Sequence, residues 1–309
     1  MPRESAASPD AAAIAALARS VEAAPWLSAA REHLAATVRH DRVPHALLIQ
    51  DAPGAGGEQL ALWLARQLLG VAAPDEERHP DFTRIGLVEE SKQIRIEQVR
   101  ELSAHLALAS HQGGYKVALI DPADALNWNA ANALLKTLEE PPARTVLILV
   151  AQQPSRLPAT ILSRCQRVRI RVPEREPTLQ WLAAHVGAGP WDAVLDVIGN
   201  APLLAAGLDP RAVLQIRDET LTALSDLAAR RADAAQLADA WTRTELPLRL
   251  TCFENWLTER TAVAWAPGHI PRKCGMVRTR VAPIRGQMSP GSSICWTSCA
   301  TCGLPWRLQ

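Results

Sequence analysis

Short apolar runs that alternate with helical patterns constrain the fold of this 309-residue chain most strongly. Four runs have the length and the continuous apolar character of buried parallel strands. They are residues 45–50, 82–87, 117–120 and 146–150. A fifth run, 168–172, alternates apolar residues with Arg, as a half-buried or edge strand does. The segments between the runs repeat apolar residues at helical spacing over 59–69, 94–108 and 129–138. Strands that alternate with helices predict a doubly wound parallel α/β sheet.

The patterns divide the chain into five segments. After Pro173 the strand patterns end, and 178–186 and 191–198 favour two short helices, followed by longer amphipathic helices over 212–231 and 234–260. Pro247 is expected to kink or split the last of these. We therefore predict a disordered or weakly helical extension (1–23), an α/β domain (24–172), a small helical lid (173–208), a further all-α segment (209–260) and an atypical tail (261–309).

A phosphate-binding loop is present in outline between the first strand and the first helix. Such loops use glycines, a Lys that neutralises phosphate charge and a Ser or Thr that holds magnesium. Pro53, Gly54 and Gly56 fit the pattern, but Asp51, Gly57 and Glu58 replace its first Gly, its Lys and its Thr. Two carboxylates then face the position of a polyphosphate and the cation is gone, which predicts exclusion of ATP.

The magnesium-side motif has changed as well. The run 117–120 ends at Asp121, as that motif requires, but Pro122 stands where a Glu should polarise the attacking water. Asp124 is displaced along the chain and is not expected to substitute. We therefore expect no functional nucleotide cofactor.

Two further segments carry a family resemblance. Asn132-Ala-Leu-Leu-Lys-Thr-Leu-Glu-Glu-Pro-Pro142 and Leu157-Pro-Ala-Thr-Ile-Leu-Ser-Arg-Cys165 resemble the AAA+ subunits of the bacterial DNA sliding-clamp loader. The chain is most similar to the delta prime subunits of the DNA polymerase III loader, over about 25–260. The resemblance implies an AAA+ sheet and a helical lid, and it makes 209–260 the start of a truncated or altered collar domain. Active relatives carry an Arg in the lid after a Gly-Asn pair, whereas this chain has Gly199-Asn-Ala-Pro202.

The resemblance also implies a role for the Ser163-Arg164-Cys165 motif. Arg164 would be an arginine finger that completes the ATP site of a neighbouring subunit. Cys165 is expected to be a buried apolar residue. The implied partners are gamma/tau and delta subunits, with the sliding clamp and primer-template DNA contacted through the complex. The alternatives are an active gamma/tau-like ATPase, and a free-standing DNA-binding protein, for which 1–260 shows no basic stripe with interleaved aromatic residues.

Several other features have structural interpretations. Lys136 and Glu140 are four residues apart and are expected to pair on one helix face, with Glu139 also at the helix end. Many relatives carry a four-cysteine zinc module before the second strand, but 70–78 contains no Cys, so no metal is expected. The N-terminus lacks a basic start and an apolar core, and no run of 18 apolar residues occurs, which favours a cytoplasmic protein.

The tail differs in composition from the rest of the chain. Residues 261–309 hold 6 Lys or Arg, no Asp or Glu, 4 of the 6 Cys and 5 Pro. The prolines break every window long enough for a collar helix. A metal site from Cys274, Cys295, Cys299 and Cys302 fits no common zinc spacing closely. Basic charge for DNA or membranes is another alternative, and a frameshifted reading of a collar domain is the interpretation we favour.

Overall fold

The computed structural model describes residues 24–72, 78–88, 91–110 and 113–265. Its first part is a sheet of five strands in the order β2-β3-β4-β1-β5, and every neighbouring pair is parallel. The strands are β1 (Ala46–Gln50), β2 (Phe82–Ile85), β3 (Lys116–Ile120), β4 (Thr145–Ala151) and β5 (Gln166–Arg169). The predicted doubly wound α/β sheet is therefore confirmed.

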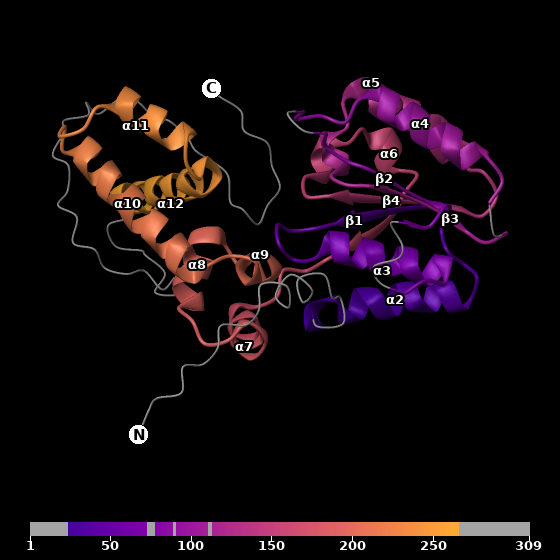
Figure 1. Cartoon of the computed structure of the whole chain (residues 1–309), viewed down its shortest axis with the longest axis horizontal. Helices are drawn as coiled ribbons and strands as arrows, with labels where there is room; N and C mark the ends of the chain where they lie inside the picture. Colours follow the sequence, from indigo (N-terminus) through magenta and orange to yellow (C-terminus); the bar gives the residue numbers. More distant parts are fainter. Residues whose placement is uncertain (1–23, 73–77, 89–90, 111–112, 266–309) are drawn as a thin grey trace.

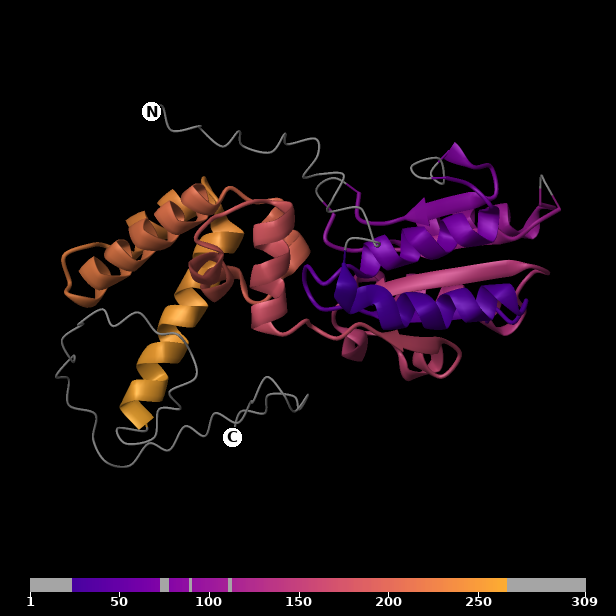
Figure 2. The same ribbon diagram turned by 90° about the horizontal axis from the view of Figure 1, so that it is seen from below.

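Helices cover both faces of the sheet (Figures 1 and 2). One face carries α2 (Ser28–Arg39) and α3 (Gly57–Leu69), and the other carries α4 (Ile96–Ala107), α5 (Trp128–Glu139) and α6 (Ala159–Leu162). In β1, Leu47 and Ile49 enter the first hydrophobic cluster, whereas Ala46 and Leu48 enter the second. Side chains of a strand alternate between faces, so a strand buried on both sides needs an unbroken apolar run.

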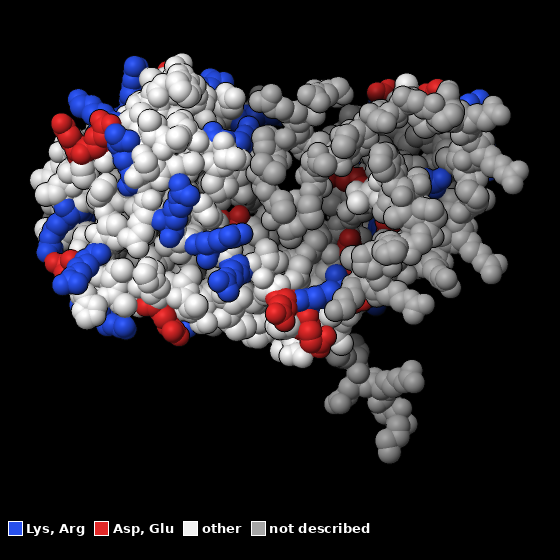
Figure 3. Space-filling view, turned by 180° about the vertical axis from the view of Figure 1, so that it is seen from behind, with Lys and Arg blue, Asp and Glu red and all other residues white. Residues whose placement is uncertain are grey.

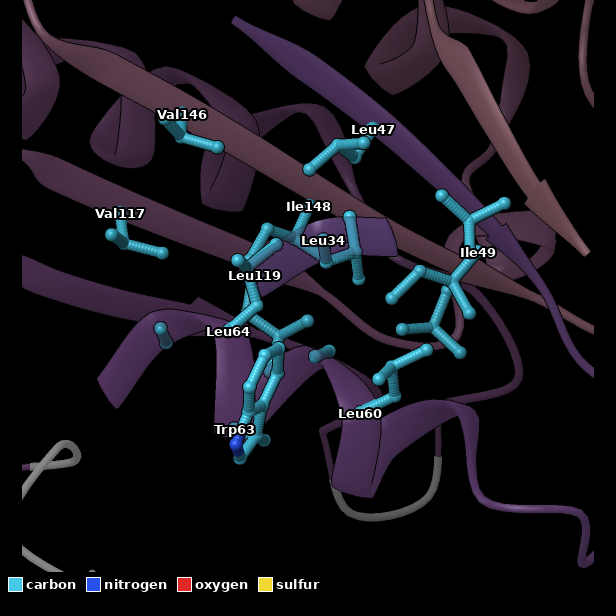
Figure 4. Packing of buried hydrophobic residues seen from close by; sticks show 14 of the residues in the cluster. Leu34, Leu47, Ile49, Leu60, Trp63, Leu64, Val117, Leu119, Val146 and Ile148 are labelled. Atoms are coloured by element: carbon cyan, nitrogen blue, oxygen red, sulfur yellow. The ribbon is translucent and has the colours of Figure 1, made fainter. Parts of the chain in front are cut away.

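The first hydrophobic cluster packs α2 and α3, the helices next to the candidate phosphate loop, against the sheet. Leu60 and Leu64 of α3 are fully buried with Leu34 of α2, and Trp63 closes the cluster at its side (Figure 4). They pack against alternate residues of β1, β3 and β4. Burying one such Leu contributes roughly 1.5–3 kcal/mol. The start of α3 is therefore held firmly against the end of β1.

The helix α2 is absent from the sequence-based prediction. Of its twelve residues only Leu34 is fully buried, so no apolar stripe marks the helix in the sequence. A short 3-10 helix, η1 (Pro25–Leu27), precedes it. Two further 3-10 turns, η3 (Ala123–Ala125) and η4 (Pro154–Arg156), follow β3 and β4.

The strand β5 lies at the edge of the sheet, as predicted, but it begins and ends earlier than the expected 168–172. Val168 and Ile170 are buried in the first cluster, whereas Arg167, Arg169 and Arg171 are exposed. Residues 141–173 contain six Arg and no Asp or Glu. Lys and Arg side chains gather over the α/β part on the face seen in Figure 3. The net charge of +1 therefore hides a locally basic surface.

After the sheet the described residues form six helices joined by short loops. The helices are α7 (Arg175–His185), α8 (Trp191–Ile198), α9 (Pro202–Ala206), α10 (Pro210–Ala228), α11 (Ala234–Thr242) and α12 (Leu246–Trp265). The predicted helix 234–260 is split, as expected, with Pro247 in the first turn of α12. A single buried cluster runs from Trp181 of α7 to Cys252 of α12, so the division into lid and collar stays a prediction.

The last described helix passes the predicted end of the helical segment. It continues to Trp265, five residues beyond Arg260. The remaining tail, with its four Cys, and the extension 1–23 lie outside the described residues. None of the helices in the described part is long and apolar enough to cross a membrane.

Candidate functional site

The loop between β1 and α3 has the backbone of a phosphate-binding loop. Gly54 and Gly56 have φ angles of 68° and 106°, which L side chains rarely adopt. The loop leads directly into α3, whose first residue is Gly57. Free backbone N–H groups at such a helix start favour an anion. The backbone frame expected from Pro53, Gly54 and Gly56 is therefore present.

An anion from the chain itself occupies the start of α3. The carboxylate of Asp51 lies against Gly57, and the backbone N–H groups of Gly57 and Ala52 act to lower its pKa. A Cβ added to Gly57 would lie 2.7 Å from both Cβ and Cγ of Asp51. A Lys cannot enter position 57 unless Asp51 moves. Compared with the usual loop pattern, Asp replaces Gly at position 51 and Gly replaces Lys at position 57. The two replacements are sterically linked, because the Asp51 side chain takes the space beside position 57.

Burial disfavours the charged form of the Asp51 carboxyl group. Burial raises the pKa of Asp51 to about 6, although the two backbone N–H groups act in the opposite direction. Its Oδ1 atom is buried and has no hydrogen-bond partner among the described residues. A nucleotide phosphate placed beside this group would add further like charge in a poorly solvated position.

A second acidic pair lies beside the loop, and an arginine bridges it. Nη2 of Arg84, on β2, lies 2.5 Å from Glu58 Oε1 and 3.6 Å from Asp121 Oδ2. Burial, with the nearby Glu58, raises the pKa of Asp121 to about 6, and Arg84 opposes this rise. The loop itself lacks the Lys of the pattern, but Arg84 places a cation beside it from another strand. Nothing in the loop sequence indicates Arg84; only its position on β2 brings it there.

Helix α9, in the segment 173–208 that is predicted to form a lid, covers this loop. The backbone N–H of Leu203, in α9, donates to the carbonyl oxygen of Gly54 at 3.0 Å. A Cβ on Gly54 would lie 2.8 Å from the Cβ atoms of Ala201 and Leu204. The cavity that remains has a volume of about 280 Å³, just below the usual range for small-molecule sites. It is lined by Asp51, Glu58, Asp121, Gln152, Leu203 and Leu204, among others.

Trp26 joins the lid to the loop from the N-terminal side. Its indole Nε1–H donates to the carbonyl oxygen of Ala55 at 2.8 Å. Its ring meets that of Trp181, in α7, edge to face at a centroid distance of 5.2 Å. Such aromatic pairs contribute about 0.5–1.5 kcal/mol beyond their buried area. The loop is therefore covered by α9 and fastened to α7.

The second candidate site is the motif that follows α6. The Arg164 guanidinium donates from Nη1 to the carbonyl oxygen of Thr160 at 2.9 Å and from Nη2 to Glu139 Oε1 at 2.7 Å. The Ser163 hydroxyl also donates to the Thr160 carbonyl. Cys165 is buried among the residues beneath α5, and burial raises the pKa of its thiol to about 11. Ser163 is therefore exposed and Arg164 partly exposed, whereas Cys165 is buried.

The ion pair expected between Lys136 and Glu140 does not form. Helix α5 ends at Glu139, and Glu140 has φ −124° and ψ 69°, outside the helical range. Residue 140 is therefore displaced from the face that carries Lys136. Glu139 makes an ion pair instead, with Arg164 across the α5–α6 contact. Asp124, the other displaced carboxylate, accepts the backbone N–H of Gln153.

Comparison with known proteins identifies relatives that match much of the chain. Residues 26–174 match the family described as DNA polymerase III, delta subunit. The chain is 35% identical over 249 residues to the DNA polymerase III subunit delta' of Pseudomonas aeruginosa, covering 75% of each protein. It is 36% identical over 176 residues to the subunit of the same name from Escherichia coli, covering 52% of this chain and 53% of that protein.

Among solved structures, the chain is similar to a DNA polymerase III gamma subunit-related protein of Thermotoga maritima. The sequence identity is 22%, the match covers 76% of this chain and 74% of that one, and the TM-score is 0.42. A likeness this loose carries no argument about function.

The buried carboxyl groups predict an unusual dependence of stability on pH. The pKa of Asp51 lies near 6 in the folded chain, above its ordinary value of 3.8, so the folded state binds the proton more tightly. The contribution of this group to the free energy of unfolding is therefore greatest below about pH 4 and is lost as the pH rises through 6. We expect Asp51→Asn to raise the free energy of unfolding at pH 7.5 by roughly 1–2 kcal/mol, with the gain vanishing towards pH 4.

Urea denaturation at both pH values measures this difference. Asp233→Asn is the matched control, because Asp233 accepts the N–H groups of Ala235 and Gln236 at the start of α11 but is exposed. A gain from Asp51→Asn that is equal at pH 4 and pH 7.5 would contradict the assigned cause.

The steric exchange at Asp51 and Gly57 predicts energetic coupling. Gly57→Lys should destabilise the chain by roughly 1–3 kcal/mol, because its Cβ meets the Asp51 side chain. The double variant Asp51→Gly with Gly57→Lys should be more stable than the sum of the two single effects. Gly114→Lys is the control, since a Cβ there meets nothing within 4 Å. Additive effects in urea denaturation would show that the two positions are independent.

Proposed function

Because the chain belongs to the family of DNA polymerase III subunit delta' proteins, we propose that it is a non-catalytic subunit of a DNA sliding-clamp loader. In this role its own loop binds no ATP, and Arg164 enters the ATP site of a neighbouring subunit. The observation that carries the proposal is the Asp51 side chain packed against Gly57 at the start of α3, where a nucleotide phosphate would have to lie.

The position of Arg164 supports its action on a second subunit. Its side chain is 35% exposed and lies at the end of α6, on the face of the sheet covered by α4 and α5. The degenerate loop packs with the first cluster, on the face covered by α2 and α3. A guanidinium that enters from outside stabilises charge on the transferring γ-phosphoryl group. Its rigid fork of donors suits phosphate oxygens.

The proposed partners follow from this arrangement. A gamma/tau ATPase subunit would receive Arg164, and a delta subunit would complete the loader. The sliding clamp and primer-template DNA would be reached through the complex, in the cytoplasm. The α/β domain (24–172) would present the arginine, and the helical segments (173–208 and 209–260) would cover the loop and contact other subunits.

The alternative functions receive less support from the site. An active ATPase needs a Lys and a hydroxyl where Gly57 and Glu58 stand, and the Asp51 side chain leaves no room for that Lys. A free-standing DNA-binding protein would use aromatic side chains between its basic residues to stack on bases. The exposed Arg167, Arg169 and Arg171 alternate with aliphatic residues instead.

The proposal predicts that the chain does not bind ATP. Titration calorimetry with ATP and magnesium should give no heat of binding in the micromolar range, since the loop offers a carboxylate in place of a cation. The gamma/tau subunit, treated in the same way, is the positive control. A clear micromolar dissociation constant for this chain would overturn the reading of the loop.

The arginine finger is tested in a reconstituted loader. Arg164→Ala should leave folding and assembly intact and lower the DNA-stimulated ATPase at the site it serves by up to about 10³-fold. Arg167→Ala, an exposed arginine on the neighbouring strand β5, is the matched control. Unchanged ATPase and clamp loading with Arg164→Ala would refute the role.

A further inference from the structure

The guanidinium of Arg164 is held from two sides before any partner is present. Nη1 donates to the Thr160 carbonyl oxygen, and Nη2 donates to Glu139 Oε1. A third, longer contact of 3.4 Å joins Nη1 to the Ser163 hydroxyl. An arginine has five N–H donors, so these contacts leave others free for an acceptor from outside. The Arg164 side chain is therefore held in one orientation while some of its N–H donors stay available.

The position of Glu139 is unfavourable for the helix that carries it. Glu139 is the last residue of α5, and Pro141 and Pro142 prevent the helix from continuing. The C-terminal end of a helix carries partial negative charge, which disfavours a carboxylate there. The exposed pair also adds little to stability, since both side chains are in contact with water. Neither the helix nor the fold explains why an acid stands at this position.

We propose that Glu139 is a positioning residue that orients Arg164 for the neighbouring ATP site. The proposal rests on the arginine-finger role given above and adds a second residue to it. The Glu139 carboxylate fixes one edge of the guanidinium, and the Thr160 carbonyl fixes the other. The finger then reaches the γ-phosphate in a defined orientation when the subunits meet.

The size of the effect follows from the freedom of the side chain. An unrestrained arginine has many rotamers, and that freedom is lost when it binds phosphate. Glu139 removes part of this freedom in advance, as positioning groups do in other catalytic sites. We expect loss of the restraint to reduce the rate about tenfold, which corresponds to about 1.4 kcal/mol of activation free energy.

The test compares Glu139→Ala with Glu139→Gln in the reconstituted loader. Glu139→Ala should lower kcat for DNA-stimulated ATP hydrolysis about tenfold, with KM for ATP, assembly and thermal stability unchanged. Glu139→Gln keeps an oxygen that accepts from Nη2, so it should restore kcat to within about threefold. Glu140→Ala is the matched control, because this adjacent acid is exposed and makes no ion pair in the described part of the chain.

A double-mutant cycle with Arg164→Ala separates this inference from the proposed function. In the Arg164→Ala background, Glu139→Ala should cause no further loss of rate. A further tenfold loss there, or a defect in assembly, would overturn the positioning role. Unchanged kcat with Glu139→Ala, while Arg164→Ala is impaired, would overturn this inference and leave the finger intact. Unchanged kcat with Arg164→Ala would overturn both.

Discussion

The carboxylate of Asp51 lies against Gly57 at the start of α3, where phosphate-binding loops offer backbone N–H groups to a nucleotide. This contact has two requirements, and the chain meets both. Position 57 must lack a side chain, because a Cβ would lie 2.7 Å from Asp51, and the loop must keep the left-handed turns of Gly54 and Gly56. A carboxylate from the chain thereby satisfies a helix end that would otherwise attract an external anion. The loop keeps its backbone shape while its binding chemistry is lost.

The helices of the predicted lid pack directly on that loop. Leu203 donates its N–H to Gly54, and the side chains of Ala201 and Leu204 lie so close that no Cβ fits at Gly54. Trp26 adds a hydrogen bond to the loop and an edge-to-face contact with Trp181. A phosphate-binding loop that holds a nucleotide must leave such a space open to the phosphates. Here the lid packs on the loop backbone directly, so the helical part and the sheet are joined through contacts that no ligand needs to complete.

The sequence predicted the sheet well because its three central strands, β1, β3 and β4, are buried on both faces, which leaves continuous apolar runs such as 146–150. It missed α2, whose one fully buried residue, Leu34, leaves no stripe. The changed residues of the loop could be identified from the sequence, because the pattern of a phosphate-binding loop is known. The contact of Arg84 with this site could not be predicted, because it depends on the strand order, which places β2 next to β3 and Asp121. The pairing of Glu139 with Arg164 was missed for a similar reason: helix spacing favoured Lys136 and Glu140, but α5 ends before residue 140.

The two candidate sites lie on opposite faces of one sheet, and this separation lets one change without the other. The loop, α3 and α2 share the first cluster, whereas Ile161, Cys165 and α5 share the second. Substitutions at 51, 57 and 58 alter contacts among the loop, the lid and β2, and none of these reaches Arg164 or Glu139. Effects of substitutions that share no partners are usually independent. A chain can therefore lose nucleotide binding and still present a well-held arginine, which is the combination that a subunit serving a neighbour's active site requires.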